Sequence, residues 1–359
     1  MATKGLGQNI NFNISFFNKV TAKDKAFLAR QLSTMISAGL PLNKAIEILD
    51  KQESNHKLKE VLGKVREDLE AGAPFSAAVA KYPEVFDRIF VNIVVSGESV
   101  GQLAEVLLQL ADQYDKDSSF SGKVKGAFAY PAFIFVAMII VGAIMMVYIV
   151  PQLTSIFEEA EAKLPLPTRV IIALSLFLQQ YWWAAIIGVV VAIILGRAYL
   201  KSAAGQRFYD LIQLKLPQNL GTEIFLTRLT RTLGMLIKAG TPILEALRIT
   251  SGAVNNIFYE EALNEAAEEV KRGVPLSRPI TSDPNLFPPI VSQMTSVGEQ
   301  TGQLDKILLN LADYYEDQVD TKLKTLSSLI EPIIIVIIGV GVGFLVYSIL
   351  IPIYNIAQI

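Results

Sequence analysis

The segment Gly97-Glu-Ser-Val-Gly-Gln-Leu103 returns 201 residues later as Gly298-Glu-Gln-Thr-Gly-Gln-Leu304. The same offset relates Leu110-Ala-Asp112 to Leu311-Ala-Asp313, and no gap is needed from about residue 27 to 158. A chance motif does not hold register over about 130 residues, so the chain contains a tandem duplication of one structural unit.

Each copy of the unit ends in a long apolar run. Residues 127–150 contain no charged residue and are long enough to cross about 30 Å of hydrocarbon as a helix. Residues 329–351 form the matching run of the second copy. A third run lies between the copies and is interrupted by Gln179-Gln-Tyr-Trp-Trp183. Because Tyr and Trp prefer the membrane interface, we expect this span at residues 181–200, after a short interfacial helix at Val170–Leu178.

The charged blocks outside the spans show helical periodicity and no period-two run long enough for a strand. We therefore predict an all-α protein with two homologous cytoplasmic helical-bundle domains of about six helices each and three transmembrane helices. The predicted order is a flexible N-terminal tail (1–21), cytoplasmic domain 1 (22–126), a span (127–150), an outside loop with the interfacial helix (151–180), a span (181–200), cytoplasmic domain 2 (201–328), a span (329–351) and an outside tail (352–359).

The orientation follows from the basic residues that flank the spans, because cytoplasmic flanks carry the excess of Lys and Arg. Eight basic residues lie on one side of the predicted membrane and two on the other. The first group is Lys116, Lys123, Lys125, Arg197, Lys201, Arg207, Lys322 and Lys324, and the second is Lys163 and Arg169. We expect a multi-pass membrane protein with its N-terminus and both charged blocks in the cytoplasm and its C-terminus on the opposite side of the membrane.

Several function classes are disfavoured by composition. Residues 1–127 hold 16 Lys and Arg against 15 Asp and Glu, and residues 197–328 hold 14 against 15, so neither block resembles a nucleic-acid surface. The chain has no cysteine and no Gly-x-x-x-x-Gly-Lys-[Ser/Thr] phosphate loop, and its one histidine, His56, has no partner at ligand spacing. The spans lack interior charges, which makes a transporter with cytoplasmic regulatory domains the less favoured alternative.

The glycines of the repeated motif, Gly97, Gly101, Gly298 and Gly302, are expected to break and restart helices. Because they precede the helix that leads into a span, we expect Gly97 or Gly298 to need a positive φ or a close backbone approach. From Gln102 to Val150 that helix would run 49 residues, or about 73 Å.

The glutamates beside these glycines, Glu98 and Glu299, have two interpretations. The simpler one is a charge at the N-terminus of the following helix. The other is a polar contact or a cation site: a Lys44–Glu98 pair in the first copy, and a weak metal candidate formed by Glu245 and Glu299 in the second. No catalytic or cofactor-binding residue is predicted.

The repeated Gly-Glu motif, the Ala-Gly-x-Pro turns at residues 38–41 and 239–242, and the prolines Pro131 and Pro332 at the span entries together resemble the type II secretion F family. These prolines are expected to kink the long helices near the membrane. The resemblance covers about residues 22–359.

The resemblance implies a non-enzymatic, homo-oligomeric platform protein of the bacterial inner membrane, without cofactors. It also implies that the outside segments, the loop 151–180 and the C-terminal tail 352–359, lie in the periplasm. Its implied partners are a cytoplasmic hexameric assembly ATPase, pilin or pseudopilin subunits, and other inner-membrane alignment proteins. Type IV pilus biogenesis and type II protein secretion are alternatives, and the general resemblance favours the pilus.

Overall fold

The computed structural model describes residues 19–152, 154 and 166–357, and every regular element in these residues is helical. The predicted all-α fold is confirmed. Nearly all of the tail predicted for residues 1–21, and residues 153 and 155–165 of the predicted 151–180 loop, lie outside the described residues.

The first copy of the duplicated unit contains six helices in the described residues. They are α1 (Ala22–Ser37), α2 (Leu42–Gln52), α3 (His56–Glu70), α4 (Phe75–Ala80), α5 (Arg88–Ser99) and α6 (Leu103–Ile144). Side chains close the N-termini of several of these helices: Thr21 and Asp24 form a capping box at α1, and Asn55 caps α3.

The second copy repeats this order with α10 (Leu220–Lys238), α11 (Ile243–Val254), α12 (Ile257–Lys271), α13 (Ser277–Thr281), α14 (Pro289–Thr301) and α15 (Leu304–Ala357). Equivalent core positions are buried in both copies: Leu32 and Leu233 are fully buried, as are Ile46 and Leu247. The same apolar pattern has thus produced the same helix order and the same core positions twice.

The described chain forms two compact units. One holds the first copy up to Ser121 together with Thr227–Asn255 and Tyr259–Asp313, and the other holds the remaining residues, including the apolar runs. Two helical stretches, Leu103–Gln152 and Leu304–Phe344, are long and apolar enough to cross a membrane. Pro131 and Pro332 lie inside these helices and end neither, and η2 (Met145–Ile149) adds a π-helical turn to the first.

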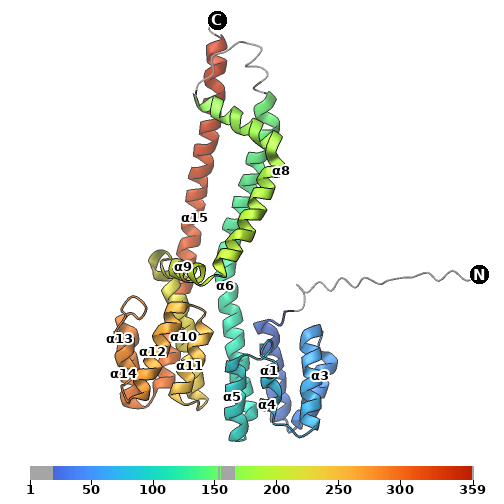
Figure 1. Cartoon of the computed structure of the whole chain (residues 1–359), viewed down its shortest axis with the longest axis vertical. Helices are drawn as coiled ribbons and strands as arrows, with labels where there is room; N and C mark the ends of the chain where they lie inside the picture. The colour runs from blue at the N-terminus through green and yellow to red at the C-terminus, as the bar shows by residue number, and fades with distance from the viewer. Residues whose placement is uncertain (1–18, 153, 155–165, 358–359) are drawn as a thin grey trace, which may run out of the picture. The chain divides into compact units, whose positions relative to one another are not determined.

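Helix α8 (Leu166–Leu200) supplies the candidate for a third span. Tyr181 leaves helical geometry with φ −121° and ψ 22°, and the two arms, Thr168–Ala184 and Ile186–Leu200, are bent by 59°. The bend lies in the aromatic segment where the sequence predicts that an interfacial helix meets a span. Helix α9 (Ala203–Leu214) follows and runs across the direction of α8 (Figure 1), and η3 (Pro217–Asn219) connects it to α10.

Candidate functional site

The repeated glutamate ties two helices of its bundle together. In the first copy, one oxygen of Glu98 accepts a hydrogen bond from the backbone N–H of Phe75 at 2.7 Å, and the other accepts from the N–H of Ser76 at 3.1 Å and from its hydroxyl. These are the first residues of α4, whose N–H groups have no partner within the helix. Glu98 therefore closes the N-terminus of α4 from the C-terminal turn of α5.

The second copy has the same arrangement. Glu299, in α14, accepts from the backbone N–H groups of Leu276 and Ser277, the latter at 3.2 Å. Both glutamates are half-buried, and hydrogen bonds to a charged acceptor contribute about 1.5–3 kcal/mol each. The repeated glutamate therefore has a structural role in each bundle.

These contacts correct the sequence-based interpretations of Glu98. The carboxylate does interact with a helix N-terminus, but the helix is α4 rather than the α6 that follows it. The Lys44–Glu98 pair is wrong, because Lys44 forms an ion pair with Glu47 at 2.7 Å on its own helix. Sequence spacing could not locate α4, which is brought to Glu98 only by the folding of the bundle.

The glycine before each glutamate lies against the first turn of the next long helix. A Cβ on Gly97 would lie 2.2 Å from Cγ2 of Val106, and one on Gly298 would lie 3.0 Å from Cα of Leu304. The expected close approach is therefore present at both positions. The expectation that Gly97 and Gly298 break a helix is wrong, since α5 continues to Ser99 and α14 continues to Thr301.

The chain reverses instead at the second glycine of each motif. Gly101 has φ 72° and Gly302 has φ 67°, a backbone conformation that favours glycine at helix C-termini. The N–H groups of Gln102 and Gln303 bond back to the carbonyls of Gly97 and Gly298 at 2.7 and 3.0 Å. In each copy the long helix, α6 or α15, begins two residues after this glycine.

An arginine–aspartate pair joins the first helix of each copy to its long helix. Arg30 contacts Asp112 at 2.9 Å and Asp115 at 2.5 Å, and the equivalent Arg231 contacts Asp313 at 3.1 Å. The side chain of Arg30 is 41% exposed, whereas that of Arg231 is 2% exposed. The sequence analysis did not pair these residues, although both partners occur at the 201-residue offset in both copies.

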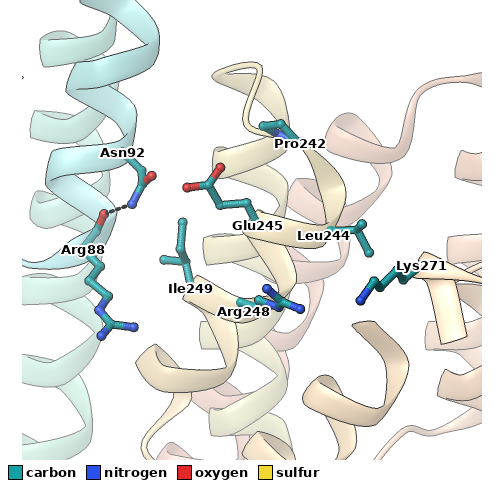
Figure 2. A pocket seen from close by; sticks show the side chains of 8 residues that line it. All are labelled: Arg88, Asn92, Pro242, Leu244, Glu245, Arg248, Ile249 and Lys271. Carbon is teal, nitrogen blue, oxygen red and sulfur yellow. Dashed lines mark hydrogen bonds between the residues drawn. The ribbon is translucent and has the colours of Figure 1, made fainter. Parts of the chain in front are cut away.

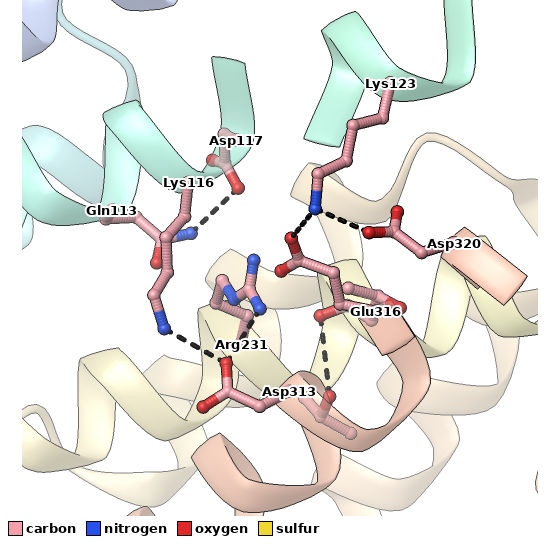
Figure 3. A network of polar contacts seen from close by, with 10 residues as sticks. Gln113, Lys116, Asp117, Lys123, Arg231, Asp313, Glu316 and Asp320 are labelled. Atoms are coloured by element: carbon pink, nitrogen blue, oxygen red, sulfur yellow. Dashed lines mark hydrogen bonds and ion pairs between the residues drawn. The ribbon is translucent and has the colours of Figure 1, made fainter. Parts of the chain in front are cut away.

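Two lysines of α6 contact acidic residues of α15. Within one unit, Lys116 reaches Asp313 at 3.0 Å, so that this carboxylate binds Arg231 as well. Within the other unit, Lys123 contacts Glu316 at 3.1 Å and Asp320 at 2.7 Å (Figure 3). Ion pairs at two positions along their length, about two helical turns apart, thus join α6 to α15.

Asp117 of α6 lies beside this network and accepts a hydrogen bond from the Gln113 amide at 3.1 Å (Figure 3). Burial raises the pKa of the Asp117 carboxyl above its ordinary value, and this effect outweighs the opposing influence of the nearby Arg231 guanidinium. The folded protein therefore binds a proton at Asp117 more readily than the unfolded chain does.

The two copies differ at Asp87, which caps α5 and binds helices α1 and α6. It contacts Lys25 at 2.6 Å and accepts from the hydroxyl of Tyr114 at 2.8 Å. Proline occupies the equivalent position 288 in the second copy. The hydroxyl of Tyr315, equivalent to Tyr114, is buried without a hydrogen-bond partner in the described structure.

A groove of about 580 Å³ contains Glu245, one of the two weak metal candidates. Glu245 faces Asn92 in Figure 2. The groove also contains three basic residues, and two of these, Arg248 and Lys271, contact Glu268 at 3.2 and 3.9 Å. The full lining is Arg88, Asn92, Pro242, Leu244, Glu245, Arg248, Ile249 and Lys271.

This setting does not resemble a cation site. Three basic side chains line the groove that contains Glu245, and both oxygens of Glu299 accept hydrogen bonds from backbone N–H groups. The described residues contain no group of three His, Cys, Asp or Glu side chains that could hold a metal ion.

Comparison with known proteins identifies the duplicated unit. The family model for type II secretion system (T2SS) protein F matches residues 28–151 and again residues 229–352. Both bounds differ by 201 residues (229 − 28 and 352 − 151), the offset at which the sequence repeats, so the predicted duplication is confirmed.

Individual relatives match nearly the whole chain. The type IV pilus assembly protein PilC of Thermus thermophilus is 38% identical over 93% of this chain and 82% of its own length. PilC of Pseudomonas aeruginosa is 32% identical over 95% of this chain and 92% of its own length. The type II secretion system protein F of Xanthomonas campestris pv. campestris is 30% identical over 92% of this chain and 82% of its own length. With both copies of the unit matched by the family model, the chain belongs to the type II secretion system protein F family.

Proposed function

We propose that this chain is the inner-membrane platform protein of a type IV pilus machine. In this role it couples a cytoplasmic hexameric assembly ATPase to the polymerisation of pilin subunits. The observation that carries the proposal is the similarity to relatives named for pilus assembly over more than nine-tenths of the chain. The equivalent role in type II secretion is the second candidate, since a relative with that name is 30% identical, against 38% and 32% for the two pilus relatives.

The architecture supports a mechanical role. Helix α15 has 54 residues, and at about 1.5 Å per residue it reaches from the second bundle through an apolar run without a break. Helix α6 does the same for the first bundle. The close approaches at Gly97 and Gly298 fix the preceding helix against the start of each long helix. Displacement of a bundle by the ATPase would therefore move the membrane segment of the same helix.

In this role the partner ATPase hydrolyses ATP and this chain does not, since the sequence of the chain contains no phosphate-loop motif. It forms a homo-oligomer with both bundles in the cytoplasm and its C-terminus in the periplasm. The eight-to-two distribution of basic residues supports this orientation. Pilin subunits and the alignment proteins of the inner membrane are its other partners.

A deletion strain of the source bacterium separates the two candidate roles. Loss of surface pili, with secretion of exoproteins unchanged and pili restored by the full-length gene, is the expected result. Loss of secretion with intact pili would assign the chain to type II secretion instead.

Coupling is tested with the purified chain in lipid nanodiscs, titrated with the ATPase encoded by the same organism's pilus genes. We expect saturable binding and a change in the rate of ATP hydrolysis, with empty nanodiscs as the control. Absence of binding at micromolar ATPase would contradict the coupling role.

A further inference from the structure

Helix α9 has its apolar side chains on the outside. Phe208 is 55% exposed, Ile212 is 47% exposed and Leu211 is 38% exposed. The one acidic residue of the helix, Asp210, is 3% exposed. Phe208, Leu211 and Ile212 share one face, because residues three and four positions apart are neighbours on a helix. A helix of a water-soluble protein buries such a face against the core, so α9 is inverted relative to that pattern.

The inner face of α9 is fixed by specific contacts, so the outward orientation is a property of the fold. The Asp210 carboxylate accepts a hydrogen bond from the backbone N–H of Ile257 at 2.9 Å. The backbone carbonyl of Asp210 accepts one from the side-chain amide of Asn256 at 3.2 Å. A Cβ on Gly205 would lie 1.9 Å from the carbonyl oxygen of Tyr199, so α9 packs directly against the end of α8. Rotating α9 to turn its apolar face inward would break the Asp210 contacts.

The helix begins where an apolar arm ends. Ala203 follows Leu200, the last residue of the arm Ile186–Leu200, after a turn in which the Ser202 hydroxyl accepts from the N–H of Gly205 at 3.1 Å. Exposed lysines, Lys201 and Lys215, flank the helix on both sides. With Asp210 turned inward, α9 presents apolar, basic and uncharged polar groups and no exposed carboxylate.

We propose that α9 is an interfacial helix that lies in the lipid surface of the leaflet where the arm Ile186–Leu200 leaves the membrane. Its apolar face, defined as Ala204, Phe208, Leu211 and Ile212, enters the boundary between headgroups and acyl chains. Its flanking lysines contact anionic phosphates. Short helices with one apolar face and basic residues around it bind lipid surfaces in this way.

Lipid is favoured over a second protein chain by continuity and charge. The end of a span is already at the headgroup level, so a helix starting three residues later has lipid beside it without further movement of the chain. The helix lies outside both stretches matched by the family model, residues 28–151 and 229–352. The inference therefore concerns a feature of this chain beyond the duplicated unit, and it holds whichever machine the protein serves.

The test uses the full-length chain, which has no cysteine, so each introduced cysteine can be labelled alone. Phe208→Cys and Ile212→Cys place an environment-sensitive fluorophore on the apolar face. Ala204→Cys is a milder substitution on the same face, which keeps the experiment interpretable if a larger side chain is needed for folding. Gln206→Cys, at an exposed polar position of the same helix, is the matched control.

Each labelled chain is reconstituted into vesicles of phosphatidylcholine with about one-third phosphatidylglycerol, with or without lipids brominated near the headgroup. We expect bromine to quench the labels at 204, 208 and 212 at least twofold more than the label at 206. Replacing phosphatidylglycerol by phosphatidylcholine should weaken this difference.

Equal quenching at all four positions would overturn the proposal. So would labels at 208 and 212 that stay unquenched by bromine, with an emission that changes when the protein is diluted in lipid. That second result would assign the apolar face of α9 to a contact with another copy of the chain.

Discussion

Replacing Gly97 by alanine tests whether the close approach of α5 to α6 is a packing constraint. The added methyl would lie 2.2 Å from Cγ2 and 2.8 Å from Cγ1 of Val106, which is 6% exposed. A β-branched side chain in a helix has one strongly preferred rotamer, so Val106 cannot turn away. Overpacking of this kind costs about 1–3 kcal/mol, and the better helix propensity of alanine returns about 1 kcal/mol. We expect a net loss of up to about 2 kcal/mol.

The structure provides a rescue and a control for this substitution. Val106→Ala removes both clashing carbons, so the double variant should be more stable than the sum of the two single losses predicts, by about 1–2 kcal/mol. Gly63→Ala is the control, because its Cβ would meet only one atom, at 3.9 Å. That variant should gain about 0.5–1 kcal/mol from helix propensity.

The second copy predicts a different outcome for the equivalent change. A Cβ on Gly298 would lie 3.0 Å from Cα of Leu304, a backbone atom that no side-chain truncation removes. Gly298→Ala should therefore destabilise the protein, and Leu304→Ala should not rescue it.

The measurement is pulse proteolysis of full-length protein in detergent across a urea series, which reports unfolding of the bundles. Energies that simply add for Gly97→Ala and Val106→Ala would refute the clash. A stabilising Gly97→Ala would refute it as well, and with it the inference that α5 and α6 are fixed together.

Three further changes test the polar contacts by the same assay. Glu98→Gln should cost about 1–2 kcal/mol, because an amide offers one acceptor oxygen to N–H groups that now bind two; an unchanged urea midpoint would contradict the capping role. Arg231→Met should cost more than Arg30→Met, about 1–3 against at most 1 kcal/mol, because the first removes the guanidinium that favours the charged form of the buried Asp117, whereas the second removes an exposed pair; equal losses would contradict this reasoning. Asp117→Asn should stabilise the protein at neutral pH, because the buried Asp117 carboxyl has a pKa above its ordinary value of about 4. The folded wild-type protein then binds more protons than the unfolded chain, so its stability falls as the pH rises from about 4 through the raised pKa. The advantage of Asp117→Asn should vanish at or below about pH 4, and a pH-independent difference would count against a buried, titrating carboxyl.

Fold class and duplication could be predicted from the sequence because both leave local signals. Helical periodicity needs only neighbours along the chain, and an uncharged run of about 20 residues has few alternatives to a membrane helix. The bend at Tyr181 is another such case, since the aromatic segment that interrupts the apolar run is visible in the sequence.

The partners of the repeated polar residues required the folded chain. The sequence shows that Glu98 recurs as Glu299, but only the packing of α4 against α5 reveals that the carboxylate caps a helix 22–23 residues earlier. The Arg30–Asp112 pair joins residues 82 positions apart, and loop closure over that distance leaves no trace in local pattern.

The repeat in the sequence by itself determined that this protein has two similar helical bundles, each ending in an apolar helix long enough to span a membrane, because a shared apolar pattern must bury the same face twice. The tertiary structure alone decided which glycine turns the chain, which helix each glutamate caps and which face of α9 is left outside. Those outcomes depend on distances between segments remote in sequence, and such distances exist only once the helices have packed.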